Sequence, residues 1–205
     1  MNIYIDFDGT LYNNTKFYQK FINIFIKQNI KKEDIEKYIK KIYKNSRNYD
    51  TIAKNLINKY NLNINILQEI NNLYNKELIF KDTIPFLEKY YQKYNLILLT
   101  LGTKKEYQLK KINSTNISKY FKKIIITTKN KSKLNIDYKN GIFIDNNPLE
   151  LKKFYNSKVT NLIRIKRDTD KYSKIDLDIN IPEFKDFEDL LKSNYIEKTG
   201  ETNYE

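Results

Sequence analysis

The chain has 205 residues, of which 40% are hydrophobic and 31% charged, which fits one globular domain or a core domain with a small insertion. It contains no Cys and no His, which excludes disulfides, Cys-ligated zinc, a cysteine nucleophile and Ser–His triads. Acid–base chemistry therefore falls to Asp, Glu, Lys or Tyr. The net charge is +13, but the lysines are spread along the whole chain, so a solvated surface is favoured over a nucleic-acid partner.

Residues 2–7 (NIYIDF) are a short apolar segment that predicts a β-strand ending in acidic residues and glycine. No basic stretch and long apolar run precede it, so we expect no secretory signal. No apolar run approaches the length of a transmembrane helix. We therefore expect a cytoplasmic protein with no membrane partner, whose oligomeric state the pattern does not specify.

A region of about 70 residues after this strand has the apolar spacing of amphipathic helices. Three stripes carry the pattern: Phe17, Phe21, Ile22 and Phe25; Ile35, Tyr38, Ile39, Ile42 and Tyr43; and Ile66, Leu67, Ile70, Leu73 and Tyr74. The stripes predict helices that pack on one another rather than a cofactor site. We assign 12–80 to a small all-α cap inserted after strand one.

From Thr83 onward, apolar strands alternate with helical segments, the pattern of βαβ units on one parallel sheet. The fold class is therefore α/β, a Rossmann-like parallel sheet core with helices on both faces. We assign 1–11 and 81–193 to this core and expect 194–205 to be a frayed tail. Strands are predicted at 95–101, 123–128, 141–145 and 159–165, with an edge strand at 178–181 and a closing helix at 184–191.

Polar side chains follow each of the first four predicted strands, and in an open α/β sheet ligands bind at this edge. Neighbouring carboxylates repel each other unless a cation lies between them, and Mg²⁺ is the hard cation that prefers oxygen ligands. A lysine and a threonine hydroxyl suit phosphoryl oxygens. The residues, in strand order, are Asp6, Asp8 and Thr10; Thr100, Gly102 and Thr103; Lys129, Lys131 and Lys133; and Asp145, Asn146 and Asn147.

The segment DFDGTL, which begins at Asp6 after an apolar strand, resembles the first motif of the haloacid dehalogenase-like phosphatases. The strand ending in Thr100 resembles the second motif, and a lysine near position 131 resembles the third. The apolar strand ending in Asp145 and Asn146 is similar to the fourth motif. All four occur in the family's order over roughly residues 1–165, and the helical insertion is similar to the family's cap.

This resemblance implies a mechanism. Asp6 is expected to attack phosphorus and form an aspartyl-phosphate, which splits hydrolysis into two easier steps. Asp8 is expected to act as general acid and then as general base, since it is the second carboxylate of that loop and no His competes with it. Thr100 is expected to bind a phosphoryl oxygen, and Lys131 to screen the negative charge.

The resemblance also implies an Mg²⁺ site formed by the side chains of Asp6 and Asp145 and the backbone carbonyl of Asp8. Asn146 stands where the family often has a second acidic residue, and we expect it to serve as an oxygen ligand or a partner of the ligands. Lys129 and Lys133 are alternatives to Lys131, which is preferred because it lies at the predicted entry from loop to helix. The expected substrate-binding residues are Gly102, Thr103 and Thr10.

The function predicted from these residues is magnesium-dependent hydrolysis of a phosphomonoester, either a small phosphorylated metabolite or a nucleotide. A phosphatase acting on nucleic-acid ends is an alternative because of the +13 charge. A non-catalytic binding module is another, because Asn146 replaces an acid. Phosphotransfer to a sugar hydroxyl also stays open, whereas dehalogenation is disfavoured because Asp8 and the metal-site pattern suit phosphoryl chemistry.

Overall fold

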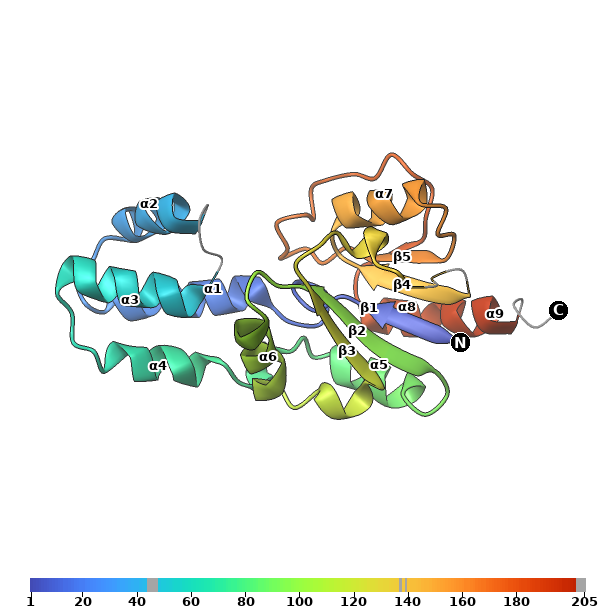
Figure 1. Ribbon diagram of the computed structural model, residues 1–205, viewed down its shortest axis with the longest axis horizontal. Coiled ribbons are helices and arrows are strands. Elements are labelled where there is room, and N and C mark those ends of the chain that lie inside the picture. The colour runs from blue at the N-terminus through green and yellow to red at the C-terminus, as the bar shows by residue number, and fades with distance from the viewer. Residues whose placement is uncertain (44–47, 137, 139, 202–205) are drawn as a thin grey trace.

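A six-stranded parallel sheet forms the centre of the computed structural model, which describes residues 1–43, 48–136, 138 and 140–201 (Figure 1). The order β3-β2-β1-β4-β5-β6 puts the first strand in the middle, paired with β2 on one side and β4 on the other. The parallel sheet is therefore confirmed. The strands are β1 (Asn2–Ile5), β2 (Asn95–Leu101), β3 (Lys123–Thr127), β4 (Gly141–Asp145), β5 (Leu162–Ile165) and β6 (Glu183–Phe184).

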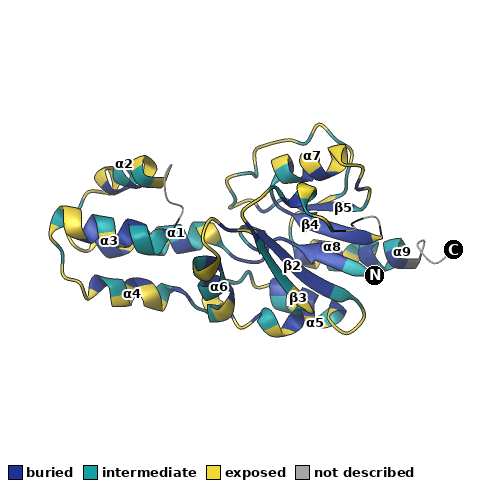
Figure 2. Cartoon of the chain, viewed as in Figure 1, coloured by how far each residue is buried: buried dark blue, intermediate teal, exposed yellow. Residues whose placement is uncertain are grey.

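Both faces of the sheet are covered by helices because side chains alternate between the faces along each strand. Ile3 and Ile5 of β1 belong to one buried cluster, whereas Tyr4 belongs to the other. The first cluster includes residues of α5 (Thr83–Tyr90), α6 (Lys105–Ser114), α8 (Phe187–Ser193) and α9 (Tyr195–Glu201). The second includes residues of α7 (Pro148–Asn156). Figure 2 shows the central strands as largely buried, whereas β3 at one edge of the sheet is mostly of intermediate exposure.

Among the described residues, four α-helices lie between β1 and α5, in the segment assigned to the cap, at the end of the molecule away from both termini (Figure 1). Asparagine side chains begin two of these helices: Asn13 accepts a hydrogen bond from the backbone N–H of Lys16, and Asn48 accepts one from that of Asp50. Most residues of the predicted apolar stripes face inward, with Phe17, Phe21 and Phe25 buried, but Tyr43 at the end of its helix is exposed. The helices are α1 (Asn14–Ile26), α2 (Lys32–Tyr43), α3 (Tyr49–Tyr60) and α4 (Ile66–Leu73).

The two connections between cap and core run side by side. Tyr12 and Ile79 form an antiparallel bridge, and the Phe80 N–H donates to the Leu11 carbonyl at 3.0 Å. Short 3₁₀ turns occur before the second connection and within the core: η1 (Lys76–Leu78), η2 (Ser118–Tyr120) and η3 (Lys131–Lys133).

Arg167, which follows β5, fastens both connections to the core. Its Nε and Nη2 donate to the Thr10 carbonyl at 3.1 and 3.0 Å, and Nη2 also donates to the Asp82 carboxylate at 3.0 Å. The guanidinium lies 3.7 Å from the centre of the Phe80 ring. One buried side chain thus joins the start of the cap, its end and the sheet.

The C-terminal part differs from the sequence-based expectation. The edge strand is β6 at Glu183–Phe184 and not at 178–181, and the closing helix begins three residues later than predicted, at Phe187. The segment expected to be frayed is helical in α9, where Ile196 is buried and Glu197 accepts a hydrogen bond from the Tyr90 hydroxyl at 2.7 Å. This packing anchors an otherwise polar segment. Across the described ranges, no helix has the length and apolar character that a bilayer span requires.

Candidate active site

Two carboxylates meet at the carboxyl edge of the sheet. Ile5 lies beside Ile144 in the register of β1 and β4, and the next residues along the two strands are Asp6 and Asp145. The Asp6 N–H donates to the Ile144 carbonyl at 2.9 Å, which continues the strand pairing by one residue. The Asn147 N–H donates to the Asp145 carboxylate at 2.8 Å. Both carboxylates are thereby held, buried, at the point where the parallel strands end.

Lys131 lies between these two carboxylates. Its Nζ is 2.5 Å from Oδ1 of Asp6 and 2.9 Å from Oδ2 of Asp145, and only 2% of the residue is exposed. The Tyr138 hydroxyl donates to the Lys131 carbonyl at 2.9 Å and fixes the start of η3. Lys129 and Lys133 are exposed. Of the three lysines considered from the sequence, Lys131 is therefore the one that contacts Asp6 and Asp145.

The cluster contains two buried carboxyl groups and one ammonium group. Burial raises the pKa of Asp6 well above its ordinary value; the Lys131 charge opposes this rise and the Asp145 charge adds to it. Burial likewise raises the pKa of Asp145. Burial alone would lower the pKa of Lys131, but the charges of Asp145 and Asp6 raise it, so the ammonium stays charged. One ammonium thus faces two carboxylates.

Asp8 is held by two residues of α6 that the sequence motifs did not identify. Gln108 Nε2 donates to Oδ2 of Asp8 at 2.6 Å and to Oγ1 of Thr100 at 2.9 Å. Lys111 Nζ forms an ion pair with Oδ1 of Asp8. The two residues are three positions apart, which places them on one face of the helix. That spacing was visible in the sequence, but the direction in which the face points was not.

Thr10 and Asn146 bind each other. The Thr10 hydroxyl donates to the Asn146 side-chain oxygen at 3.2 Å and accepts a hydrogen bond from the Asn146 backbone N–H at 3.0 Å. The Asn146 amide nitrogen donates to the carboxylate of Asp170, which the motifs also did not identify. Burial raises the pKa of Asp170 despite this hydrogen bond. These contacts favour a role for Asn146 in joining loops rather than in direct metal coordination.

The other predicted substrate-binding residues lie in the turn after β2. The Gly102 N–H donates to the Thr127 carbonyl at 2.9 Å, so this donor is already used within the sheet. A Cβ at Gly102 would lie 3.0 Å from Cβ of Gln108, so the absence of a side chain makes room for Gln108. Thr103 is exposed. The structure therefore connects Gly102 with Asp8 and Thr100 through Gln108.

Replacement of Gly9 by Ala should disrupt the first motif. Gly9 has a φ of +91°, and a Cβ there would lie 2.2 Å from Nδ2 of Asn146. We expect a loss of about 2 kcal/mol or more in unfolding free energy, measured by urea denaturation. Gly200→Ala is the control, because its Cβ would first meet the Tyr94 hydroxyl at 3.2 Å, the end of a side chain. Equal stability of the two variants would contradict this assignment.

The donor set suits Mg²⁺, which takes one or two carboxylates and keeps several waters. Asp6 and Asp145 supply two carboxylates against one ammonium. Oε2 of Glu150 is buried without a hydrogen-bond partner among the described residues, and its charge acts on Asp145. A divalent cation would offset this negative charge. Residues 1–43, 48–136, 138 and 140–201 contain no cluster of three or more Asp, Glu, His or Cys side chains, so a metal here would also rely on backbone oxygen and water.

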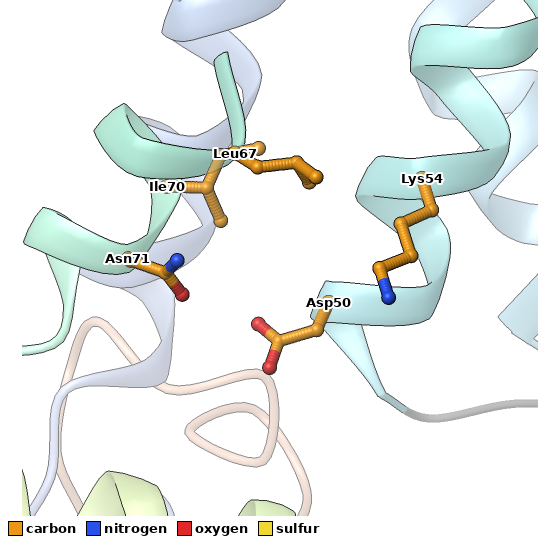
Figure 3. Close-up of a pocket in the computed structure, with 5 residues that line it drawn as sticks. All are labelled: Asp50, Lys54, Leu67, Ile70 and Asn71. Atoms are coloured by element: carbon orange, nitrogen blue, oxygen red, sulfur yellow. The ribbon is translucent and has the colours of Figure 1, made fainter. Parts of the chain in front are cut away.

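The cap contacts the core beside this site. Lys110 of α6 donates to the Asp50 carboxylate of α3 at 2.7 Å and to the Asn71 side chain of α4 at 2.8 Å. Asp50 and Asn71 also line a cavity of about 200 Å³ within the cap, where Figure 3 shows them facing each other. The other lining residues are Lys54, Leu67 and Ile70. This cavity is therefore separate from the Asp6–Asp145 pair.

The sequence matches no protein-family model and no curated protein. Solved structures do match. A haloacid dehalogenase-like hydrolase from Burkholderia xenovorans superposes with a TM-score of 0.72 at 11% identity, covering 93% of this chain and 94% of that one. A HAD phosphatase from Thermococcus onnurineus has a TM-score of 0.60 at 18% identity, covering 95% and 98%.

The magnesium-bound HAD-hydrolase YfnB from Bacillus subtilis has a TM-score of 0.61 at 13% identity, again covering 95% and 98% of the two chains. These likenesses extend over the cap as well as the sheet, because nearly the whole of each chain is covered. The fold of this chain is that of the haloacid dehalogenase-like hydrolases.

Proposed function

We propose that this protein is a magnesium-dependent phosphatase that hydrolyses a small phosphomonoester through an aspartyl-phosphate on Asp6. The observation that supports this best is the buried cluster of Asp6, Lys131 and Asp145, with Asp8 two residues along the same loop. The cluster joins a carboxylate nucleophile to a fixed cation, as phosphoryl transfer requires. The likeness in fold to a HAD phosphatase agrees with it.

In the first step, a carboxylate oxygen of Asp6 attacks phosphorus. The bond between phosphorus and the ester oxygen breaks, and Asp8 donates a proton to the leaving alcohol. Lys131 stabilises the negative charge that spreads over Asp6 and the phosphoryl oxygens. The Thr100 hydroxyl donates to one of those oxygens.

In the second step, water attacks the phosphorus of the aspartyl-phosphate. Asp8, now a carboxylate, takes a proton from that water, and the bond between phosphorus and the Asp6 oxygen breaks. Inorganic phosphate leaves and the Asp6 carboxylate is restored. Asp6, Asp145 and the backbone carbonyl of Asp8 would hold Mg²⁺, which supplies positive charge against the phosphoryl oxygens when bound.

Hydrolysis of p-nitrophenyl phosphate tests this proposal, together with a panel of phosphorylated sugars and nucleotides. We expect turnover with Mg²⁺, loss of turnover after chelation and full recovery when Mg²⁺ is restored. A rate that chelation does not change would contradict the metal requirement. Absence of turnover for every phosphomonoester would overturn the proposal in favour of a binding module.

Phosphotransfer is the second candidate, because a β-phosphoglucomutase from Thermotoga maritima has this fold, with a TM-score of 0.58 at 13% identity. Its first step would be the same, and a sugar hydroxyl would replace water in the second. Product analysis separates the two: free phosphate in proportion to substrate consumed supports hydrolysis, and a phosphorylated acceptor supports transfer.

The +13 charge motivates a phosphatase for nucleic-acid ends. Such an enzyme would bind oligonucleotides at low salt, with an affinity that falls steeply as salt increases.

A further inference from the structure

Both oxygens of the Asp8 carboxylate are held from helix α6. Gln108 binds Oδ2 at 2.6 Å, and Lys111 pairs with Oδ1. Asp8 belongs to the loop after β1, whereas α6 follows β2. The conformation of Asp8 is therefore set by a helix about one hundred residues further along the chain.

The contacts of Gln108 also fix the direction of the Thr100 hydroxyl. A carboxylate only accepts hydrogen bonds, so the Gln108 atom that faces Asp8 must be the amide nitrogen. The second hydrogen of that nitrogen goes to Oγ1 of Thr100 at 2.9 Å. Since Oγ1 accepts from Gln108, the hydroxyl hydrogen of Thr100 stays available to donate elsewhere. Gln108 thus occupies an acceptor site of Thr100 and leaves its hydroxyl hydrogen available as a donor.

Lys111 is buried, and its ammonium pairs with Asp8 instead of facing solvent. Only 7% of the residue is exposed. Its ammonium lies 5.4, 4.9 and 5.8 Å from the ring centres of Phe7, Tyr12 and Tyr107. These rings confine the cation, and Asp8 supplies the negative charge that a buried ammonium requires.

We propose that Gln108 and Lys111 are positioning residues that orient the Asp8 carboxylate for proton transfer and the Thr100 hydroxyl for the phosphoryl group. This inference rests on the proposed function. A protonated carboxyl has one O–H donor and keeps acceptor sites on both oxygens, so Asp8 can keep both contacts while it donates to the leaving group. Proton transfer depends on this geometry because the two heavy atoms must lie within hydrogen-bonding reach.

The test compares two esters that differ in how much they need a proton donor. Phenolate is a poorer leaving group than p-nitrophenolate, so phenyl phosphate depends more on Asp8. We expect Gln108→Met and Lys111→Met to lower kcat/KM for phenyl phosphate at least about tenfold more than for p-nitrophenyl phosphate. Lys105→Met is the matched control, since Lys105 is exposed on the first turn of α6. An equal loss on both esters, or no loss, would overturn the proposal.

A second comparison separates positioning from direct substrate binding. In an Asp8→Asn background, Lys111→Met should produce no further selective loss, because the group that it positions is already gone. A selective loss of the same size in both backgrounds would overturn the proposal.

Crystal structures of the variants test the positioning role of Gln108 and Lys111 independently of turnover. We expect Gln108→Met to turn the Asp8 carboxylate away from Thr100 while the Asp6–Lys131–Asp145 cluster keeps its arrangement. An Asp8 side chain in its original place would overturn the positioning role. If the unmodified protein hydrolyses no phosphomonoester, the proposed function fails, and these structures still show whether α6 positions Asp8.

Discussion

Asp6→Asn should abolish magnesium-dependent hydrolysis of p-nitrophenyl phosphate, with a loss of at least about a thousandfold in kcat. The amide lacks the anionic carboxylate oxygen that forms the aspartyl-phosphate, and its neutral charge weakens the proposed Mg²⁺ site. Steady-state assays at saturating Mg²⁺ measure this loss. Asp34→Asn makes the same chemical change at an exposed residue of α2 and should keep full activity. Equal rates in Asp6→Asn and the parent would refute the nucleophile assignment.

The same substitution should leave the fold intact. Because burial raises the pKa of Asp6, the folded protein binds more protons than the unfolded chain above the ordinary carboxyl pKa. Ionised Asp6 therefore lowers the unfolding free energy progressively as the pH rises through that range, and a neutral amide removes this loss. We expect metal-free Asp6→Asn to be at least as stable as the parent at pH 8, and Mg²⁺ to raise the melting temperature of the parent more than that of the variant.

Lys131→Met should be the most destabilising single change at the site. It removes the ammonium between two buried carboxylates, and loss of one partner of a buried ion pair costs about 3–5 kcal/mol. For a chain of this size, such a loss lowers the melting temperature by roughly 10 °C. Thermal unfolding of the metal-free protein at pH 8 measures it. The loss should shrink toward pH 5, because protonation then neutralises Asp6 and Asp145 in the folded state.

Two comparisons test this explanation. Lys129→Met and Lys133→Met remove exposed lysines from the same segment and should change stability by less than about 0.5 kcal/mol. Adding Asp145→Asn to Lys131→Met should recover part of the loss, because one of the uncompensated carboxylates disappears. The explanation fails if Lys131→Met melts at the same temperature as Lys133→Met, or if Asp145→Asn adds fully to the loss.

The sheet and the Asp6–Asp145 pair could be predicted from the sequence because their signals are local. An apolar run that ends in polar residues identifies both the strand and the edge of the sheet where its last side chains lie. β1 and β4 have this pattern, and β6 does not, since it has only two residues and is polar at one of them. Its position depends instead on pairing with β5.

Gln108, Lys111 and Asp170 could not be assigned from the sequence because their roles depend on tertiary placement. A polar face on α6 is typical of a solvent-exposed surface. Whether that face points toward the site depends on the rotation of the helix about its axis, which the sequence does not give. Among the three alternating lysines after β3, the sequence favours Lys131 by its place at the predicted entry from loop to helix, and η3 places that residue inward.

The contacts of Arg167 with both connections can form only late in the synthesis of this protein. A ribosome completes every helix of the cap long before it adds the arginine that fastens both connections, and before β4 arrives beside β1. The emerging N-terminal half therefore lacks the Arg167 contacts that hold both connections to the core. A nascent chain stalled ahead of position 167 should be cut readily by protease between the bundle and the unfinished sheet, and the released protein should resist cleavage there.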